Sequence, residues 1–137
     1  MIAIELYSLY DYTDAKDDNL IVRWLADDRI SRRDRAKLDF KLDALIRMDF
    51  DLAIHTKMLA QVYKNVLKLK VHGEVQLRPM LCRGPIDVAT EYTLLAGAVE
   101  IGGRLKPESV KENAVARCGH IVAHKGTKHR CKHERFT

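Results

Sequence analysis

The sequence is poor in the residues that mark several classes of protein. It has 137 residues but only three cysteines, three prolines and seven glycines, which excludes disulfide-rich scaffolds, collagen-like chains and low-complexity chains. Its longest apolar run, residues 94–99, is too short to span a membrane and is closed by Glu100. Residues 1–11 carry Glu5 and Asp11 where a secretion signal would carry positive charge. These absences predict a cytoplasmic protein that does not associate with membranes.

Apolar residues are abundant enough for one core, and charge is distributed unevenly. Apolar residues make up 47% and charged residues 31% of the sequence, which at this length predicts a single globular domain. Residues 117–137 hold six of the 24 basic residues, one of the 19 acidic residues and four of the six histidines, so they carry the whole net charge of +5. Such a segment indicates either an anionic partner, such as nucleic acid or an acidic protein, or a solvated tail.

The first half of the chain reads as one strand followed by two helices. Alternating apolar residues predict a strand over about residues 2–9. Apolar residues on one helical face predict a short helix over residues 20–28, capped by one of the three residues that precede it. Ser31 is the expected N-cap of a longer helix over residues 31–52. Residues 53–65 fit either a helical turn or an irregular connection.

The second half reads as three strands and a helix. Residues 66–72 and 75–82 alternate with a period of two, and a three-residue loop that contains Gly73 keeps their apolar residues on one face. Pro79 predicts a bulge or an unpaired edge in the second of these strands. Residues 91–102 predict a central strand that is covered on both faces, and a helix should follow from Ser109.

This order of elements predicts an α+β domain. We expect a small antiparallel sheet, made of the N-terminal strand and a three-stranded meander, with two N-terminal helices and a C-terminal helix.

Four side chains on the two alternating strands form the strongest candidate site. The expected register pairs Lys70 with Arg78 and places Lys68 and His72 on the same solvent-facing surface. Such a surface could hold single-stranded RNA, with Arg78 clamping a phosphate, the lysines stabilising negative charge and His72 or Lys68 transferring protons. This chemistry needs no metal or other cofactor. Alternatively, these cations simply keep an exposed sheet soluble.

The cysteines and histidines of the C-terminal segment form a second pattern. Cys118, His120, His124, His129, Cys131 and His133 offer six potential zinc ligands, but without the paired spacing that characterises a zinc finger. We therefore expect no metal site and free thiols, and keep a zinc-organised tail as an alternative hypothesis.

Three stretches of the sequence together resemble the RelE/ParE toxin superfamily, and within it the phage-derived HigB-type branch. They are RRDRAKLDFKLDALIR (residues 32–47), YKNVLKLKVHGEVQLRPMLCRG (residues 63–84) and EYTLLAGAVEIGGRLKPESVKENAVARC (residues 91–118). The resemblance implies a RelE-like toxin domain over residues 1–118. Residues 119–137 do not align with the family, and their composition predicts a basic, partly disordered tail rich in histidine and cysteine.

The resemblance also implies a function and partners. It indicates a toxin of a type II toxin-antitoxin system that is silenced by a cognate antitoxin. The expected activity is that of an mRNA interferase, a hydrolase (endoribonuclease) that cuts messenger RNA on the ribosome without a metal ion. A homodimer is compatible with the resemblance. Lys70 and Arg78 match family arginines of two adjacent strands, and Lys64 matches a lysine before them. The remaining expected RNA-binding residues are cations near the third strand and in the tail: Arg104, Lys106, Lys128, Arg130 and Lys132.

The sequence departs from the family pattern at two points. Glu100 and Ile101 stand where a basic pair is usual, and the C-terminal catalytic tyrosine or acidic residue of the family has no clear counterpart. The same scaffold occurs in the ParE branch, whose members inhibit DNA gyrase and cut no RNA. A non-catalytic binding module, either a gyrase inhibitor or an inactive phage-derived protein, is therefore the alternative function.

Overall fold

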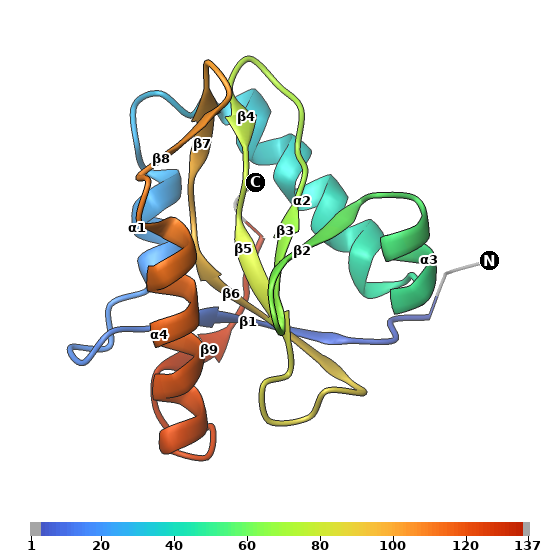
Figure 1. Ribbon diagram of the computed structural model, residues 1–137, viewed down its shortest axis with the longest axis vertical. Coiled ribbons are helices and arrows are strands. Elements are labelled where there is room, and N and C mark those ends of the chain that lie inside the picture. The colour runs from blue at the N-terminus through green and yellow to red at the C-terminus, as the bar shows by residue number, and fades with distance from the viewer. Residues whose placement is uncertain (1–3, 136–137) are drawn as a thin grey trace.

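The computed structural model describes residues 4–135, which form four helices and two β-sheets (Figure 1). The helices are α1 (Leu20–Leu25), α2 (Arg32–Ile46), α3 (Phe50–His55) and α4 (Val110–Ala123). The strands are β1 (Ser8–Tyr12), β2 (Leu59–Tyr63), β3 (Val66–Leu69), β4 (Gln76–Leu77), β5 (Met80–Arg83), β6 (Glu91–Ala96), β7 (Val99–Ile101), β8 (Arg104–Lys106) and β9 (Arg130–Lys132). The predicted α+β class is confirmed.

The larger sheet has six strands in the order β2-β3-β5-β6-β1-β9, and the smaller sheet has the order β4-β7-β8. All neighbouring pairs are antiparallel except β1 and β6, which run parallel from Ser8 opposite Glu91 to Asp11 opposite Leu94. The meander of β3, β5 and β6 agrees with the expectation. The N-terminal strand joins it in parallel, so the sheet is mostly rather than wholly antiparallel.

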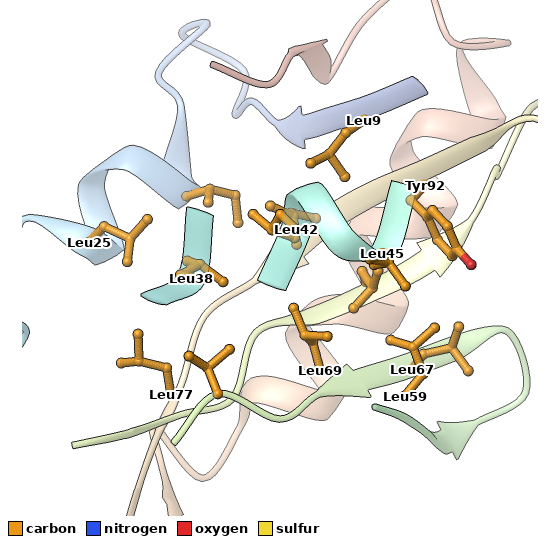
Figure 2. Packing of buried hydrophobic residues seen from close by; sticks show 14 of the residues in the cluster. Leu9, Leu25, Leu38, Leu42, Leu45, Leu59, Leu67, Leu69, Leu77 and Tyr92 are labelled. Atoms are coloured by element: carbon orange, nitrogen blue, oxygen red, sulfur yellow. The ribbon is translucent and has the colours of Figure 1, made fainter. Parts of the chain in front are cut away.

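Helices cover both faces of the larger sheet. In Figure 1, α2 and α3 lie on one side of it and α4 lies on the other. Leu38, Leu42 and Leu45 recur at helical spacing along α2 and are at most 2% exposed, and Figure 2 shows them directed at Leu69 and Leu77 of the sheet side. Burial of each leucine contributes about 1.5–3 kcal/mol, so this contact is a main source of stability.

A second apolar cluster lies beneath α4. Val110, Ala114 and Ile121 of the helix pack against Met80 and Cys82 of β5, and all five side chains are fully buried. The strand β6 separates the two clusters, and each of its six residues is buried. The prediction of a central strand covered on both faces is therefore confirmed for β6.

The predicted helix starts are confirmed by their caps. The Asn19 side chain accepts hydrogen bonds from the backbone N–H groups of Ile21 and Val22 at the start of α1. The Ser31 hydroxyl accepts from the N–H of Asp34 at the start of α2. Both residues satisfy donors that have no partner within their helix.

The predicted helix over residues 31–52 is wrong in length, because α2 ends at Ile46 and α3 begins at Phe50. The carbonyl oxygen of Ile46 accepts hydrogen bonds from the N–H groups of Leu6 and Tyr7, at 2.7 and 3.2 Å. The N-terminal segment thus takes the acceptor that a continuing helix would need. This contact is between residues distant in the sequence, so helical periodicity could not reveal it.

The first strand also lies later than predicted. It spans Ser8–Tyr12, whereas Ile4 is 79% exposed and Ile2 is outside the described residues. Asp11 lies beyond the predicted end of the strand but is fully buried within the observed one. Its carboxylate accepts from Asn19 Nδ2 at 2.9 Å and lies 2.7 Å from His133 Nδ1. These distant partners allow a charged residue inside the sheet.

The predicted register around Gly73 is confirmed. Val66 lies opposite Cys82 and Lys68 opposite Met80, and an isolated bridge joins Val71 to Leu77. A Cβ atom at Gly73 would lie 2.0 Å from Asp34 Oδ1, so a glycine is needed where the loop passes over α2. The expected irregularity at Pro79 is also observed, since the second strand is divided into β4 and β5.

The predicted strand over residues 91–102 is divided as well. It breaks after Ala96, and β7 belongs to the smaller sheet. A Cβ at Gly97 would lie 1.8 Å from the Trp24 ring, so the close approach of this side chain requires glycine at the break.

Residues 119–135 are part of the folded domain. The helix α4 crosses the expected boundary at residue 118, and β9 pairs with β1 through Cys131 opposite Asp11. The expectation of a separate, partly disordered tail is therefore not met in this range. Over residues 4–135, no helix has both the length and the apolar character needed to cross a membrane.

Candidate functional site

The confirmed register brings the predicted side chains onto one face of the sheet. Continued from Lys68 opposite Met80 to Val71 opposite Leu77, it places Lys70 opposite Arg78 and His72 opposite Gln76. Residues opposed in an antiparallel ladder point to the same face, and alternate residues of a strand lie ~7 Å apart. We call Lys68, Lys70 and His72 the basic row.

The helix α4 covers the neighbouring end of this face. Val66, Met80 and Cys82 lie in the same alternation as the basic row but are buried under α4. Beyond them, Lys68 and Lys70 are half-buried and His72 is exposed. None of the three makes an ion pair with another described residue. The basic row therefore presents uncompensated positive charge beside a helix.

The prediction that Arg78 lies on a solvent-facing surface is wrong. Its side chain is 6% exposed, and Nη1 donates hydrogen bonds to the carbonyl oxygens of Leu77 and Val71 at 2.9 and 3.4 Å. Its Nη2 lies 3.6 Å from Glu100 Oε2. A guanidinium engaged in this way cannot clamp a phosphate while the fold stays intact.

The position of Glu100 explains the burial of Arg78. The pairing of β4 with β7 sets Gln76 opposite Glu100, so this carboxylate reaches the Arg78 side of the ladder. The sequence already marked Glu100 as a departure from the basic pair of the family. Its effect on Arg78 depends on the pairing of β4 with β7 in the smaller sheet. This sheet was not predicted, because residues 91–102 were expected to form a single strand.

A glutamine orients the imidazole of His72. Gln76 Oε1 lies 2.7 Å from His72 Nδ1 and 3.5 Å from Arg78 Nη2. An amide oxygen can only accept, so His72 Nδ1 carries the hydrogen and Nε2 keeps its lone pair in the neutral ring. In its neutral form the exposed histidine therefore offers Nε2 as a proton acceptor. Gln76 is a site residue that the sequence reasoning missed.

Lys64 lies at the other end of β3, next to an aromatic ring. It occupies the turn between β2 and β3 with a φ of 48°, and its Nζ is 5.3 Å from the centroid of the Tyr63 ring. Lys111, in the first turn of α4, approaches the same ring at 5.5 Å. Tyr63 is 42% exposed. Sequence reasoning missed Tyr63 and Lys111, because only the packing of α4 brings them together.

Arg104 and Lys106 are exposed but do not join the basic row. They lie opposite Ile101 and Val99 in the β7-β8 hairpin, and Val99 also lies opposite Leu77. They therefore share the face of Leu77, whereas Glu100 and Gln76 share the other face. The two expected RNA-binding cations point away from the side that carries His72.

The C-terminal cations lie at the opposite edge of the larger sheet. The strand β9 is separated from β3 by four strand spacings, or about 19 Å. Arg130 contacts Glu91 Oε1 at 3.0 Å and stacks 4.1 Å above the Tyr10 ring, so its charge is compensated. Lys128 and Lys132 are exposed. The structure does not bring these three residues to the basic row.

Three histidines of the C-terminal segment gather around Tyr12. Its hydroxyl lies 2.8 Å from His120 Nδ1, and its ring stacks on His129 with centroids 5.7 Å apart. The rings of His129 and His124 are 5.2 Å apart. Burial raises the pKa of Tyr12, although the nearby Arg117 opposes this shift. Within residues 4–135, no three His, Cys, Asp or Glu side chains are grouped so that they could hold a metal ion.

The three thiols occupy different environments. Cys82 is buried, Cys118 is half-buried, and their sulfur atoms are 3.9 Å apart, while Cys131 is exposed. The hydrogen-bonding contact with the Cys82 thiol lowers the pKa of Cys118, whereas burial raises the pKa of Cys131.

No protein-family model matches this chain, and neither a curated protein nor a solved structure matches it.

Proposed function

We propose that the protein is an RNA-binding toxin of the RelE/ParE type that cleaves messenger RNA on the ribosome without a metal and is silenced by an antitoxin protein. The observation that carries the proposal is the basic row, in which Lys68, Lys70 and His72 share one face without compensating carboxylates. The α+β class, with helices before and after a mostly antiparallel sheet, supports the resemblance to this family.

The chemistry follows from the orientation of His72. Its Nε2 takes the proton of a ribose 2′-hydroxyl, whose oxygen then attacks the adjacent phosphorus. The bond from phosphorus to the 5′ oxygen breaks, and Lys68 gives a proton to this leaving oxygen. The products carry a 2′,3′-cyclic phosphate and a 5′-hydroxyl. Lys70 stabilises the negative charge that develops on the phosphoryl oxygens.

Arg78 has a positioning role in this proposal rather than a contact with phosphate. It binds the carbonyl groups of Val71 and Leu77, on either side of the loop that carries His72, and contributes to the position of Gln76. Loss of Arg78 would therefore disturb the fold and the imidazole together.

The enclosure of Arg78 by Glu100 favours a second candidate function. The one arginine expected to hold the scissile phosphate is buried and paired, so the surface could bind without cleaving. In that case the protein is a non-catalytic module that inhibits DNA gyrase, or an inactive phage-derived relative.

The test is to express the protein in a bacterial host and to map new 5′ ends in cellular messenger RNA while growth is followed. The wild type should arrest growth and produce cuts inside translated frames. His72→Ala should abolish the cuts, and His55→Ala, which removes another exposed histidine at the end of α3, should retain them.

Two outcomes would contradict the nuclease proposal. Intact transcripts together with inhibited supercoiling would support the binding module. Cuts that persist unchanged in His72→Ala would remove the histidine, and with it the proposed mechanism.

A further inference from the structure

The outer face of α2 carries an aromatic ring that the core does not use. Phe40 is 73% exposed, whereas Leu38 and Leu42, two residues to either side and on the inner face of the helix, are at most 2% exposed. A single exposed ring is informative only where it belongs to a wider surface that suits a ligand.

The ring belongs to a groove between α2 and the end of the basic row. The groove has a volume of about 490 Å³, and its apolar part consists of Ala36, Phe40 and Val71. Its polar lining is entirely cationic or titratable: Arg33, Lys37, Lys41 and His72. We call this surface the Phe40 groove.

The acidic residues of this part of α2 face the interior. Asp34 is fully buried, and its carboxylate accepts from the N–H groups of Glu74 and Val75 at 3.1 Å. Asp39 is 1% exposed. Lys37 and Lys41 lie one helical turn apart, about 6 Å along the axis, and neither makes an ion pair with a described residue.

We propose that the Phe40 groove binds one nucleotide of a single-stranded RNA, with its base stacked on the Phe40 ring and its flanking phosphates against Lys37 and Lys41. An aromatic platform beside a row of cations is the arrangement by which proteins hold single strands without regard to sequence. This inference rests on the proposed function, because His72 belongs both to the basic row and to the groove. The basic row lies on the α4 face of the sheet and the groove on the α2 face, so an RNA strand that contacts both passes around the end of β3 at His72.

The continuity through His72 favours RNA over an acidic peptide as the occupant. The aromatic part of the groove is a single exposed ring with cations on the adjacent helical turns. This matches the alternation of base and phosphate in a nucleotide chain. An acidic amphipathic peptide would instead need apolar contacts repeated along the helix.

The first experiment measures binding of a short ribo-oligonucleotide that contains 2-aminopurine, whose fluorescence is quenched by stacking. Phe40→Ala should weaken binding about 5- to 150-fold, the loss that corresponds to one stacked base. Phe40→Trp should retain affinity, and its added indole fluorescence should fall on RNA binding. Leu52→Ala is the matched control, because Leu52 is 49% exposed on α3, outside the groove.

A second measurement addresses the phosphates. Lys37→Ala combined with Lys41→Ala should reduce the slope of log K against log salt by about 1.4, because two contacts are removed. Lys16→Ala, an exposed lysine in the loop before α1, should leave the slope unchanged. The circular dichroism spectrum of each variant should match that of the wild type, because these changes lie on the surface.

The outcomes separate this inference from the proposed function. If Phe40→Ala binds the oligonucleotide like wild type while His72→Ala loses cleavage, the groove inference is wrong and the nuclease proposal stands. If Phe40→Ala loses binding although the wild type cuts no transcript, the groove binds RNA and the nuclease proposal fails. If a peptide of alternating Glu and Leu binds in a Phe40-dependent manner and RNA does not, the occupant is a protein segment and the inference is overturned.

Discussion

The basic row and the C-terminal segment are both cationic, but the structure uses their charges differently. In the C-terminal segment, Arg130 pairs with Glu91, Arg135 pairs with Asp43, and His133 lies 2.7 Å from the buried Asp11. The lysines of the basic row have no such partners among the described residues. The arginines of the C-terminal segment therefore contact other parts of the fold, whereas its exposed lysines, Lys125, Lys128 and Lys132, make no ion pair with a described residue.

The comparison teaches that the number of cations in a segment is a weak guide to binding. A cation that contacts a carboxylate of its own fold would have to give up that contact before it could bind an anion. The distinction depends on partners such as Asp11, Asp43 and Glu91, which are far from the segment in the sequence. Uncompensated cations on one surface are the more informative observation.

The largest effect should come from the buried carboxylate of β1. Asp11→Ala removes the partner of His133 and of Asn19 from a fully buried position and should lower the free energy of unfolding by about 3–5 kcal/mol. Asp43→Ala breaks the more exposed pair with Arg135 and should cost less than about 1 kcal/mol. Urea unfolding of both variants measures the difference. A loss for Asp11→Ala as small as that for Asp43→Ala would mean that the buried contacts of Asp11 contribute little to stability.

Arg78 should show the next largest effect on stability. Arg78→Met leaves the carbonyl groups of Val71 and Leu77 without this donor, and should cost about 1–3 kcal/mol of unfolding free energy. Lys70→Met, at the opposing position, removes a half-buried cation without a described ion partner and should cost much less. If the two variants unfold alike, Arg78 is not the structural residue that its contacts indicate.

Local features of the fold could be predicted from the sequence. The cap Ser31, the register around Gly73 and the covered strand β6 were correctly predicted, and Asn19 was one of three candidate caps, because each leaves a signal in residues close in the sequence. The end of α2 was not, because it depends on hydrogen bonds from Leu6 and Tyr7.

The candidate site was predicted only in part, for the same reason. The alternation along β3 placed Lys68, Lys70 and His72 together. The enclosure of Arg78 requires Glu100 from the smaller sheet, and the Phe40 groove requires α2 to pack beside Val71 and His72. Helical periodicity identified the buried face of α2, but it gave no reason to select Phe40 among the residues on the outer face.

The salt dependence of RNA binding tests the two cationic regions directly. Lys68→Ala and Lys70→Ala should each reduce the slope of log K against log salt by about 0.7, the value for one contact with single-stranded RNA. Lys132→Ala, in β9 at the far edge of the sheet, should leave the slope unchanged. An equal change for Lys132 would mean that the RNA also contacts the C-terminal segment, contrary to the comparison.

The smallest effect concerns one thiol near each of the two cationic regions. Cys118 faces β5 near the basic row, and Cys131 lies in β9 of the C-terminal segment. The hydrogen-bonding contact with Cys82 lowers the pKa of Cys118, whereas burial disfavours the thiolate of Cys131 and raises its pKa. Because alkylation requires the thiolate, the pH midpoint for reaction with iodoacetamide should be lower at Cys118 than at Cys131. Cys82→Ala removes this thiol contact and should raise the midpoint of Cys118 while leaving that of Cys131 unchanged. Peptide mass spectrometry across a pH series measures both midpoints in one sample. If the Cys118 midpoint does not respond to Cys82→Ala, the contact between the two thiols under α4 is not made in solution.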